Sequence, residues 1–525
     1  MVIKKTSIVL CVLALLVYTT CSSSQAPAPQ LEQPQGEEPV AQAAKTDDEE
    51  PAPQEKAARG DSEAQERLYP RSPYEDDFDY VINGSGRGRT VTITGYHGSL
   101  SELVIPAGIQ GFPVVCLDTH SFAEKQLSAV SIPETVVTIE SGAFEGNQLL
   151  HLTLPDSVLT IGDMAFSRNA LVTVVLGDNL ELIGNQAFYS NNLREAHIPD
   201  SVMFVGDMAF QNNQLTTVTI GAALTTIGMQ TFAMNQLTEL NLGEYVTIID
   251  DLAFEENLLT EIIIPDTVTH IGRQAFNKNK IAGVTLGKSL VSIGDAAFQE
   301  NELRTVVFPE QLETIGNLAF YKNYLTEIVI PDSLVSIGDA AFQENQLQSV
   351  KLGTGLVSIG DQAFHKNRIT HLIIGEQVEY IGDLAFQDNL LTTVTIPDSV
   401  TYLGTQSFYK NNLSTVMIGN GVTVISSLAF QENQLVAVGL GASVKIIREQ
   451  AFNENKLTAI ALPESVRVVE RLAFAGNTIR TITLGSNVQI AEGNAFGTYG
   501  ATFPYEYSNT AGTYIFNETT KSWHR

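Results

Sequence analysis

The chain has 525 residues, of which 44% are hydrophobic and 17% charged, so most of it can bury an apolar core. Its formal net charge of -29 argues against nucleic acid as the main ligand, because such binding needs a basic surface that neutralises phosphates. The acidity favours basic or neutral partners instead.

The amino terminus is typical of an exported protein. A lysine pair precedes an apolar run over residues 8–18, which is too short for a stable membrane span, and Cys21 follows. The segment resembles a bacterial lipoprotein signal, so we predict a signal peptide over 1–20 and lipidation at Cys21. Cleavage and release is the alternative, because Tyr18, Thr19 and Thr20 depart from the residues usual before a lipidated cysteine.

Residues 21–73 are rich in Pro, Ala, Gln and Glu, which predicts a disordered tether behind the anchor. The tether contains Arg59, Gly60 and Asp61, the tripeptide that integrins recognise, although so short a word also arises by chance. We therefore expect an exported, lipid-anchored protein at the bacterial cell surface or outer membrane.

A period of 22 residues dominates the rest of the chain. From Phe122 to Phe496 every twenty-second residue is Phe, and no insertion or deletion interrupts the register. Such regularity indicates a solenoid of about eighteen coils that bury their apolar rows against one another. With neighbouring strands about 4.8 Å apart, the array should extend over roughly 80 Å.

The sequence pattern of each unit predicts one short strand followed by a segment that returns the chain to the next coil. Residues 327–330 should be extended, with Ile328 facing inward, Val329 facing outward, and Pro331 ending the strand. Stacking would join such strands into a long parallel sheet. The return half, residues 334–342, fits either a helical turn or a second short strand.

An asparagine three residues after every repeat Phe from Phe144 to Phe474 could be read as a sugar-binding array. The favoured interpretation is a structural ladder, because a group that is identical in every coil is more useful for holding turns together than for recognising one ligand. The ladder includes Asn147, Asn169, Asn191, Asn213, Asn301, Asn345, Asn389 and Asn477.

The outward strand position seven residues after Phe varies from coil to coil and is rich in Thr and Glu. This variation fits either plain β-propensity on a solvated sheet or a ligand-binding face, since solenoids use broad regular surfaces to hold large partners. The candidate ligand-face residues are Thr173, Glu195, Thr217, Glu239, Glu261, Thr305, Glu327, His371, Thr393 and Thr415.

Both ends of the solenoid depart from the repeat and predict β-rich caps. Residues 74–118 should form an amino-terminal cap with a hairpin and an irregular first coil, residues 119–497 the solenoid, and residues 498–525 a carboxyl-terminal cap with a hairpin that ends near Trp523. Such caps also block edge-to-edge polymerisation.

The repeat pattern V-x-I-P-x-S-V-x-x-I-G-x-x-A-F-x-x-N-x-L resembles the BspA-like leucine-rich repeats of bacterial surface proteins. The resemblance covers the chain from about Phe78 onward. It implies adhesion to host matrix proteins or to other microbes, but it transfers no binding residue, because ligand contacts are not fixed to a motif position in the family.

The sequence offers no motif for catalysis, a metal or a cofactor. Its eight histidines lack zinc-type spacing, and no nucleophile elbow or phosphate-binding loop stands out. We therefore predict a non-enzymatic surface adhesin that binds host extracellular-matrix or microbial surface proteins, with no nucleic acid partner. A structural envelope spacer without an external ligand is the alternative.

Overall fold

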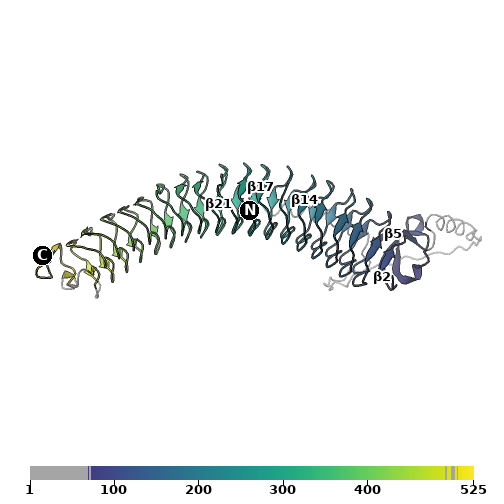
Figure 1. Ribbon diagram of the computed structural model, residues 1–525, viewed down its shortest axis with the longest axis horizontal. Helices are drawn as coiled ribbons and strands as arrows, with labels where there is room; N and C mark the ends of the chain where they lie inside the picture. Colours follow the sequence, from purple (N-terminus) through teal and green to yellow (C-terminus); the bar gives the residue numbers. More distant parts are fainter. Residues whose placement is uncertain (1–68, 70–71, 491–493, 498–502, 505–506) are drawn as a thin grey trace, which may run out of the picture.

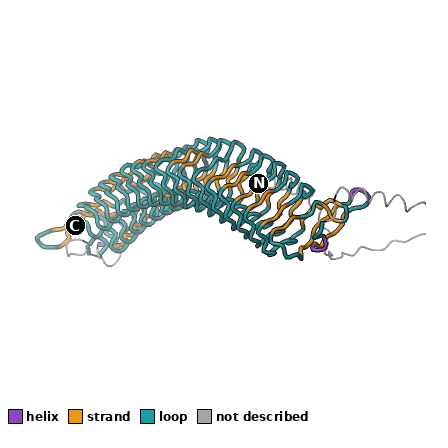
Figure 2. The backbone as a smooth tube through the Cα atoms, turned by 45° about the vertical axis from the view of Figure 1, so that its right-hand side comes forward, coloured by secondary structure: helices purple, strands orange, loops and turns teal. Residues whose placement is uncertain are grey.

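The computed structural model describes residue 69 and residues 72–490, 494–497, 503–504 and 507–525. Successive 22-residue coils stack into a long arched solenoid (Figure 1). The tube in Figure 2 consists almost entirely of strands and turns, and two short 3-10 helices, η1 (Glu75–Asp77) and η2 (Gly86–Gly88), lie in the amino-terminal cap. The predicted solenoid is thus confirmed.

Each regular coil carries a front segment and a back segment. Where front strands form, they begin seven residues after a repeat Phe, and the back strands from β7 to β34, each two residues long, begin sixteen residues after it; β36 begins one residue earlier in its coil. The return half therefore contains a second short strand, which decides between the two alternatives that the sequence leaves open.

The back strands stack in parallel, in register and one coil apart, into sheets that end at β13, β28 and β36. They are β7 (Thr138–Ile139), β9 (Thr160–Ile161), β11 (Leu182–Ile183), β13 (Phe204–Val205), β15 (Thr226–Ile227), β16 (Ile248–Ile249), β18 (His270–Ile271), β20 (Ser292–Ile293), β21 (Thr314–Ile315), β23 (Ser336–Ile337), β25 (Ser358–Ile359), β26 (Tyr380–Ile381), β28 (Tyr402–Leu403), β30 (Val424–Ile425), β32 (Ile446–Ile447), β34 (Val468–Val469) and β36 (Gln489–Ile490).

The front strands pair in parallel only in short sets, so the long sheet runs along the back rather than along the front, where we expected it. They are β3 (Glu102–Val104), β6 (Ala129–Ser131), β8 (His151–Thr153), β10 (Thr173–Val175), β12 (Glu195–His197), β14 (Thr217–Thr219), β17 (Glu261–Ile263), β19 (Gly283–Thr285), β22 (Glu327–Val329), β24 (Ser349–Lys351), β27 (Thr393–Ile396), β29 (Thr415–Ile418), β31 (Ala437–Gly439), β33 (Ala459–Ala461) and β35 (Thr481–Leu484).

Glycine at one repeat position lets the turns after the back strands approach closely, although Glu140, Asp250, Arg448 and Glu470 occupy it in coils whose back strands also pair. A β-carbon on Gly338 would lie 2.4 Å from the carbonyl carbon of Gly316 in the preceding coil, so a side chain there would push the coils apart. Ser426 occupies this position between β28 and β30, where the sheet is interrupted. Its hydroxyl donates to the Leu403 carbonyl at 2.5 Å.

The core is a continuous spine of phenylalanine rings. Consecutive repeat phenylalanines stack nearly parallel, with ring centroids 4.9 Å apart at Phe122 and Phe144 and 5.6 Å apart at Phe166 and Phe188. Leu, Ile, Val and Ala rows pack around this spine and are buried as predicted. Because each coil buries its rows mainly against its two neighbours, stability accumulates coil by coil.

The two ends are capped on different sheets. The hairpin of β1 (Phe78–Asn83) and β2 (Thr90–Tyr96) continues the back sheet through β5 (Phe112–Leu117), which also pairs with β4 (Gly108–Ile109). At the other end β37 (Gly512–Asn517) pairs antiparallel with β35, the last front strand, and with β38 (Ser522–His524). Both predicted hairpins are therefore present.

Candidate binding surfaces

All ten predicted ligand-face residues have exposed side chains. They lie on front strands or at the equivalent position of a coil, as Glu327 does in β22. Because the intervening residue, Ile328 in this strand, is buried, the alternation of the strand fixes which side chains reach solvent. A ligand contact at these residues stays a prediction.

A second outward column lies two residues further along each front strand, and it was missing from the predicted ligand face. Strand alternation did place Val329 of this column facing outward, since residues i and i+2 share a face, but the predicted ligand face was limited to the first column. Several coils place a large apolar side chain there in contact with solvent. These are Val175, Ile263, Val307, Val329, Ile373 and Met417.

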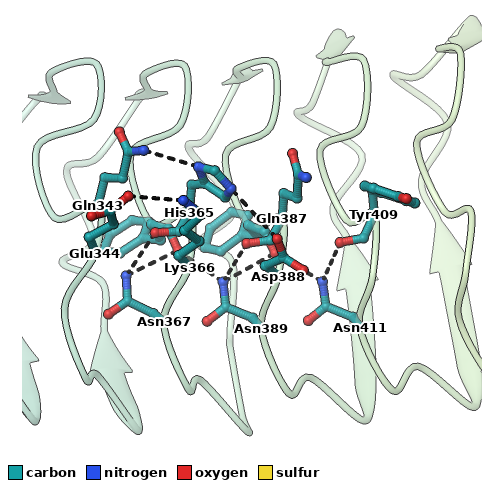
Figure 3. A network of polar contacts seen from close by, with 12 residues as sticks. Gln343, Glu344, His365, Lys366, Asn367, Gln387, Asp388, Asn389, Tyr409 and Asn411 are labelled. Carbon is teal, nitrogen blue, oxygen red and sulfur yellow. Dashed lines mark hydrogen bonds and ion pairs between the residues drawn. The ribbon is translucent and has the colours of Figure 1, made fainter.

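The repeat asparagines bind each coil to the preceding one. Asn345 Oδ1 accepts a hydrogen bond from the Leu325 backbone N–H at 3.0 Å, and Nδ2 donates to the carbonyls of Phe320 at 2.8 Å and Phe342 at 3.2 Å. Because these amides are buried and occupied by the backbone, they offer no surface for a sugar. Figure 3 shows three members of the row, Asn367, Asn389 and Asn411.

Aspartates form two further ladders that sequence reasoning did not find. Asp339 Oδ1 accepts from the Asp361 backbone N–H at 2.8 Å, and Asp361 Oδ1 accepts from the Asp383 N–H at 2.8 Å. In the second ladder the Thr354 N–H donates to Asp332, and this bond lowers the pKa of the Asp332 carboxyl. The recurrence of Asp directly after the repeat Gly and Pro was the available signal.

A buried histidine lies in the polar column directly after the Phe spine (Figure 3). Gln343 Nε2 lies 3.1 Å from His365 Nδ1, and His365 Nε2 lies 3.8 Å from Asp388 Oδ2. Burial lowers the pKa of His365, and the nearby Lys366 acts in the same direction, whereas Asp388 and Glu344 oppose them. The neutral imidazole is therefore favoured in the folded protein.

An open groove of about 440 Å³ crosses four back strands, from β16 to β21. Its lining includes the carboxylates of Asp250, Asp251 and Asp295 together with His270 and Arg273. The charges are mixed in sign, and among the described residues no group of three or more His, Cys, Asp or Glu side chains is arranged to hold a metal.

Two of the predicted sites cannot be placed on the fold. Cys21 and the tripeptide Arg59, Gly60 and Asp61 lie outside the residues that the structure describes. Within the described part of the chain, no helix has the length and hydrophobicity needed to cross a bilayer.

The solved structures that resemble this chain are bacterial leucine-rich-repeat proteins. One from Bacteroides ovatus is 19% identical to this chain, with a TM-score of 0.33. The alignment covers 79% of this chain and 89% of the Bacteroides ovatus chain. A leucine-rich cell surface protein from Faecalibacterium prausnitzii is 20% identical (TM-score 0.37), and the alignment covers 83% of this chain and 97% of that protein. The pneumococcal vaccine antigen PcpA is 19% identical (TM-score 0.34), and the alignment covers 77% of this chain and 94% of PcpA.

No curated relative matches the chain. The BspA type leucine-rich repeat region matches it in six overlapping copies, at residues 115–236, 160–282, 225–345, 271–392, 313–437 and 423–521. These matches cover most of the chain and coincide with the stacked coils, so the chain belongs to the BspA type leucine-rich repeat family.

Proposed function

We propose that this protein is a lipid-anchored bacterial surface adhesin that holds a protein ligand on its front face. The observation that carries the proposal is the pair of outward columns on the front strands, where side chains vary from coil to coil over a regular scaffold. A solenoid presents contact area in this way to large partners. The family membership agrees with a binding role.

The proposed ligand is a host extracellular-matrix component or a protein on another cell. The test is binding of the chain from Ser22 to Arg525 to immobilised fibronectin, fibrinogen, laminin and collagen. Saturable binding that survives Asp61→Glu supports adhesion by the solenoid, whereas binding lost in that variant assigns adhesion to the tether. Absence of binding to all four proteins favours the envelope-spacer alternative.

The proposed anchor is tested separately at Cys21. Export of the full chain in a bacterial host with labelled palmitate should yield a labelled protein in the membrane fraction. Cys21→Ser should abolish the label and release the protein into the soluble fraction. An unlabelled wild-type protein in the medium would contradict lipidation and favour ordinary cleavage.

A further inference from the structure

The second outward column becomes strongly apolar in the middle of the solenoid. Ile263, Val307, Val329 and Ile373 are 69%, 82%, 57% and 85% exposed. They occupy four of six consecutive coils, while Thr285 and Lys351 occupy the other two. The six positions extend over roughly 24 Å at about 4.8 Å per coil.

Two glutamates of the first outward column accompany these apolar side chains. Glu261 and Glu327 precede Ile263 and Val329 by two residues, so each carboxylate shares the outward face of its strand with an exposed apolar side chain. Neither glutamate has an ion-pair partner within the described residues. The front of these coils therefore presents two unpaired carboxylates and the exposed Lys351 beside exposed hydrocarbon.

We propose that the front of the six coils from Glu261 to Ile373 docks a protein surface that carries basic residues beside apolar ones. This inference rests on the proposed binding role and names the chemistry of the partner. Burial of the apolar column supplies the hydrophobic contribution, and lysine or arginine side chains of the partner pair with Glu261 and Glu327.

The charge balance favours such a partner over a second copy of the chain. Two copies would bring together molecules that each carry a formal net charge of -29, and their carboxylates would repel at low salt. A partner with a basic surface is attracted by the same negative charge. The association should consequently weaken as the ionic strength rises.

A defined peptide tests this chemistry while the natural ligand is still unidentified. The probe is an eight-residue blocked peptide that alternates lysine with valine, titrated into the chain from Ser22 to Arg525. Glutamate–valine and lysine–serine peptides of equal length separate the contributions of charge and hydrocarbon. The protein variants are the double substitutions Val307→Ser with Val329→Ser, and Glu261→Gln with Glu327→Gln.

Val335→Ser is the matched control. Val335 is 52% exposed, close to the value for Val329, and it belongs to the same coil, but it lies beside back strand β23. Circular dichroism and thermal midpoints establish that every variant keeps the fold. Since all substituted side chains are exposed, no variant should lose measurable stability.

We expect saturable binding of the lysine–valine peptide alone, weakened on the order of tenfold by the double valine substitution and several-fold by the double glutamate substitution. Val335→Ser should bind like the wild type. The proposal is overturned by no binding of this peptide, by equal binding to all variants, or by a wild-type dimer in sedimentation that the valine substitutions abolish.

The same variants on the four matrix proteins separate this proposal from the adhesin proposal. If the peptide binds through the two columns but no matrix protein binds, the docking-surface proposal stands and adhesion to those four proteins is refuted. If every variant binds the matrix proteins with equal strength, the adhesin proposal stands and the docking-surface proposal is refuted.

Discussion

Gly353 lies directly against the carbonyl group of Pro331 in the preceding coil, so that a β-carbon on Gly353 would approach the Pro331 oxygen to 2.2 Å. Gly375 has the same position in the next coil, yet its nearest neighbour would be the Gly353 carbonyl oxygen at 3.9 Å. The same repeat position is therefore tightly packed in one coil and open in the next.

This difference predicts opposite effects of one substitution at two equivalent glycines. Gly353→Ala should lower the free energy of unfolding by about 1–3 kcal/mol, because the coils must move apart to admit a methyl group. Gly375→Ala should be neutral or stabilise by about 0.4–1 kcal/mol through the unfolded chain. Urea unfolding of both variants checks this, and equal losses would show that the Pro331 contact is not the cause.

Adjacent asparagines provide a second matched pair. Asn411 is buried, accepts from the Leu391 N–H at 3.1 Å and donates to the Phe386 carbonyl at 2.9 Å, whereas Asn412 is exposed. Asn411→Ala should cost on the order of 3 kcal/mol, because it leaves buried backbone groups without partners.

Asn412→Ala should stay within about 0.5 kcal/mol of the wild type. Chemical denaturation followed by circular dichroism measures both variants. A tolerated Asn411→Ala would refute the structural role of the ladder and reopen the sugar-binding interpretation.

His365 makes the stability of the solenoid depend on pH. Because burial lowers the pKa of His365 below its ordinary value of 6.5, the folded protein binds the proton less readily than the unfolded chain does. Stability should therefore be fully present above about pH 6.5 and should fall as the pH drops toward the folded pKa.

Replacement of the histidine isolates this contribution. His365→Gln should flatten the fall in urea midpoint between about pH 7 and pH 5. His371→Gln is the control, because His371 lies in the same coil with an exposed side chain. Parallel pH profiles for the wild type and His365→Gln would contradict the prediction.

Two tyrosines on the back of the solenoid form a stacked pair. The rings of Tyr380 and Tyr402 lie 4.6 Å apart, and the Tyr380 hydroxyl donates to Asp361 at 3.3 Å. Burial, followed by the negative charge of Asp361, raises the pKa of Tyr380 to about 12.

Asp361→Asn should lower the pKa of Tyr380 only part of the way toward 10, since burial remains. Carbon NMR of ring-labelled tyrosine measures the titration, with Tyr380→Phe to assign the resonance. Asp339→Asn is the control, because the tyrosine hydroxyls of this pair bond to Asp361 and Asp383 instead. Full return of the pKa to its ordinary value would show that charge, rather than burial, is the main cause.

The repeat made the architecture predictable from the sequence, because a fixed interval between Phe122 and Phe496 allows little but identical stacked coils. The location of the long sheet was not predictable. The residues of the front strands have the stronger β-pattern, yet the back strands, which are only two residues long, pair over more consecutive coils.

The candidate face was found only in part. Strand alternation identified the outward direction of both Glu327 and Val329, whereas the degree of exposure of Val307 and Ile373 depends on how far neighbouring side chains cover each position. The burial of His365 could not be predicted, because the column directly after the Phe spine varies in sequence and has no inward pattern.

The uninterrupted 22-residue register makes the length of the molecule an adjustable quantity. Since each coil closes on its neighbours and both hairpin caps contact only the terminal coils, recombination between repeats can add or remove whole units without altering either end. Each exchange changes the span by about 4.8 Å. The number of coils thus sets how far the molecule reaches, while the fold, the spine and the caps stay the same.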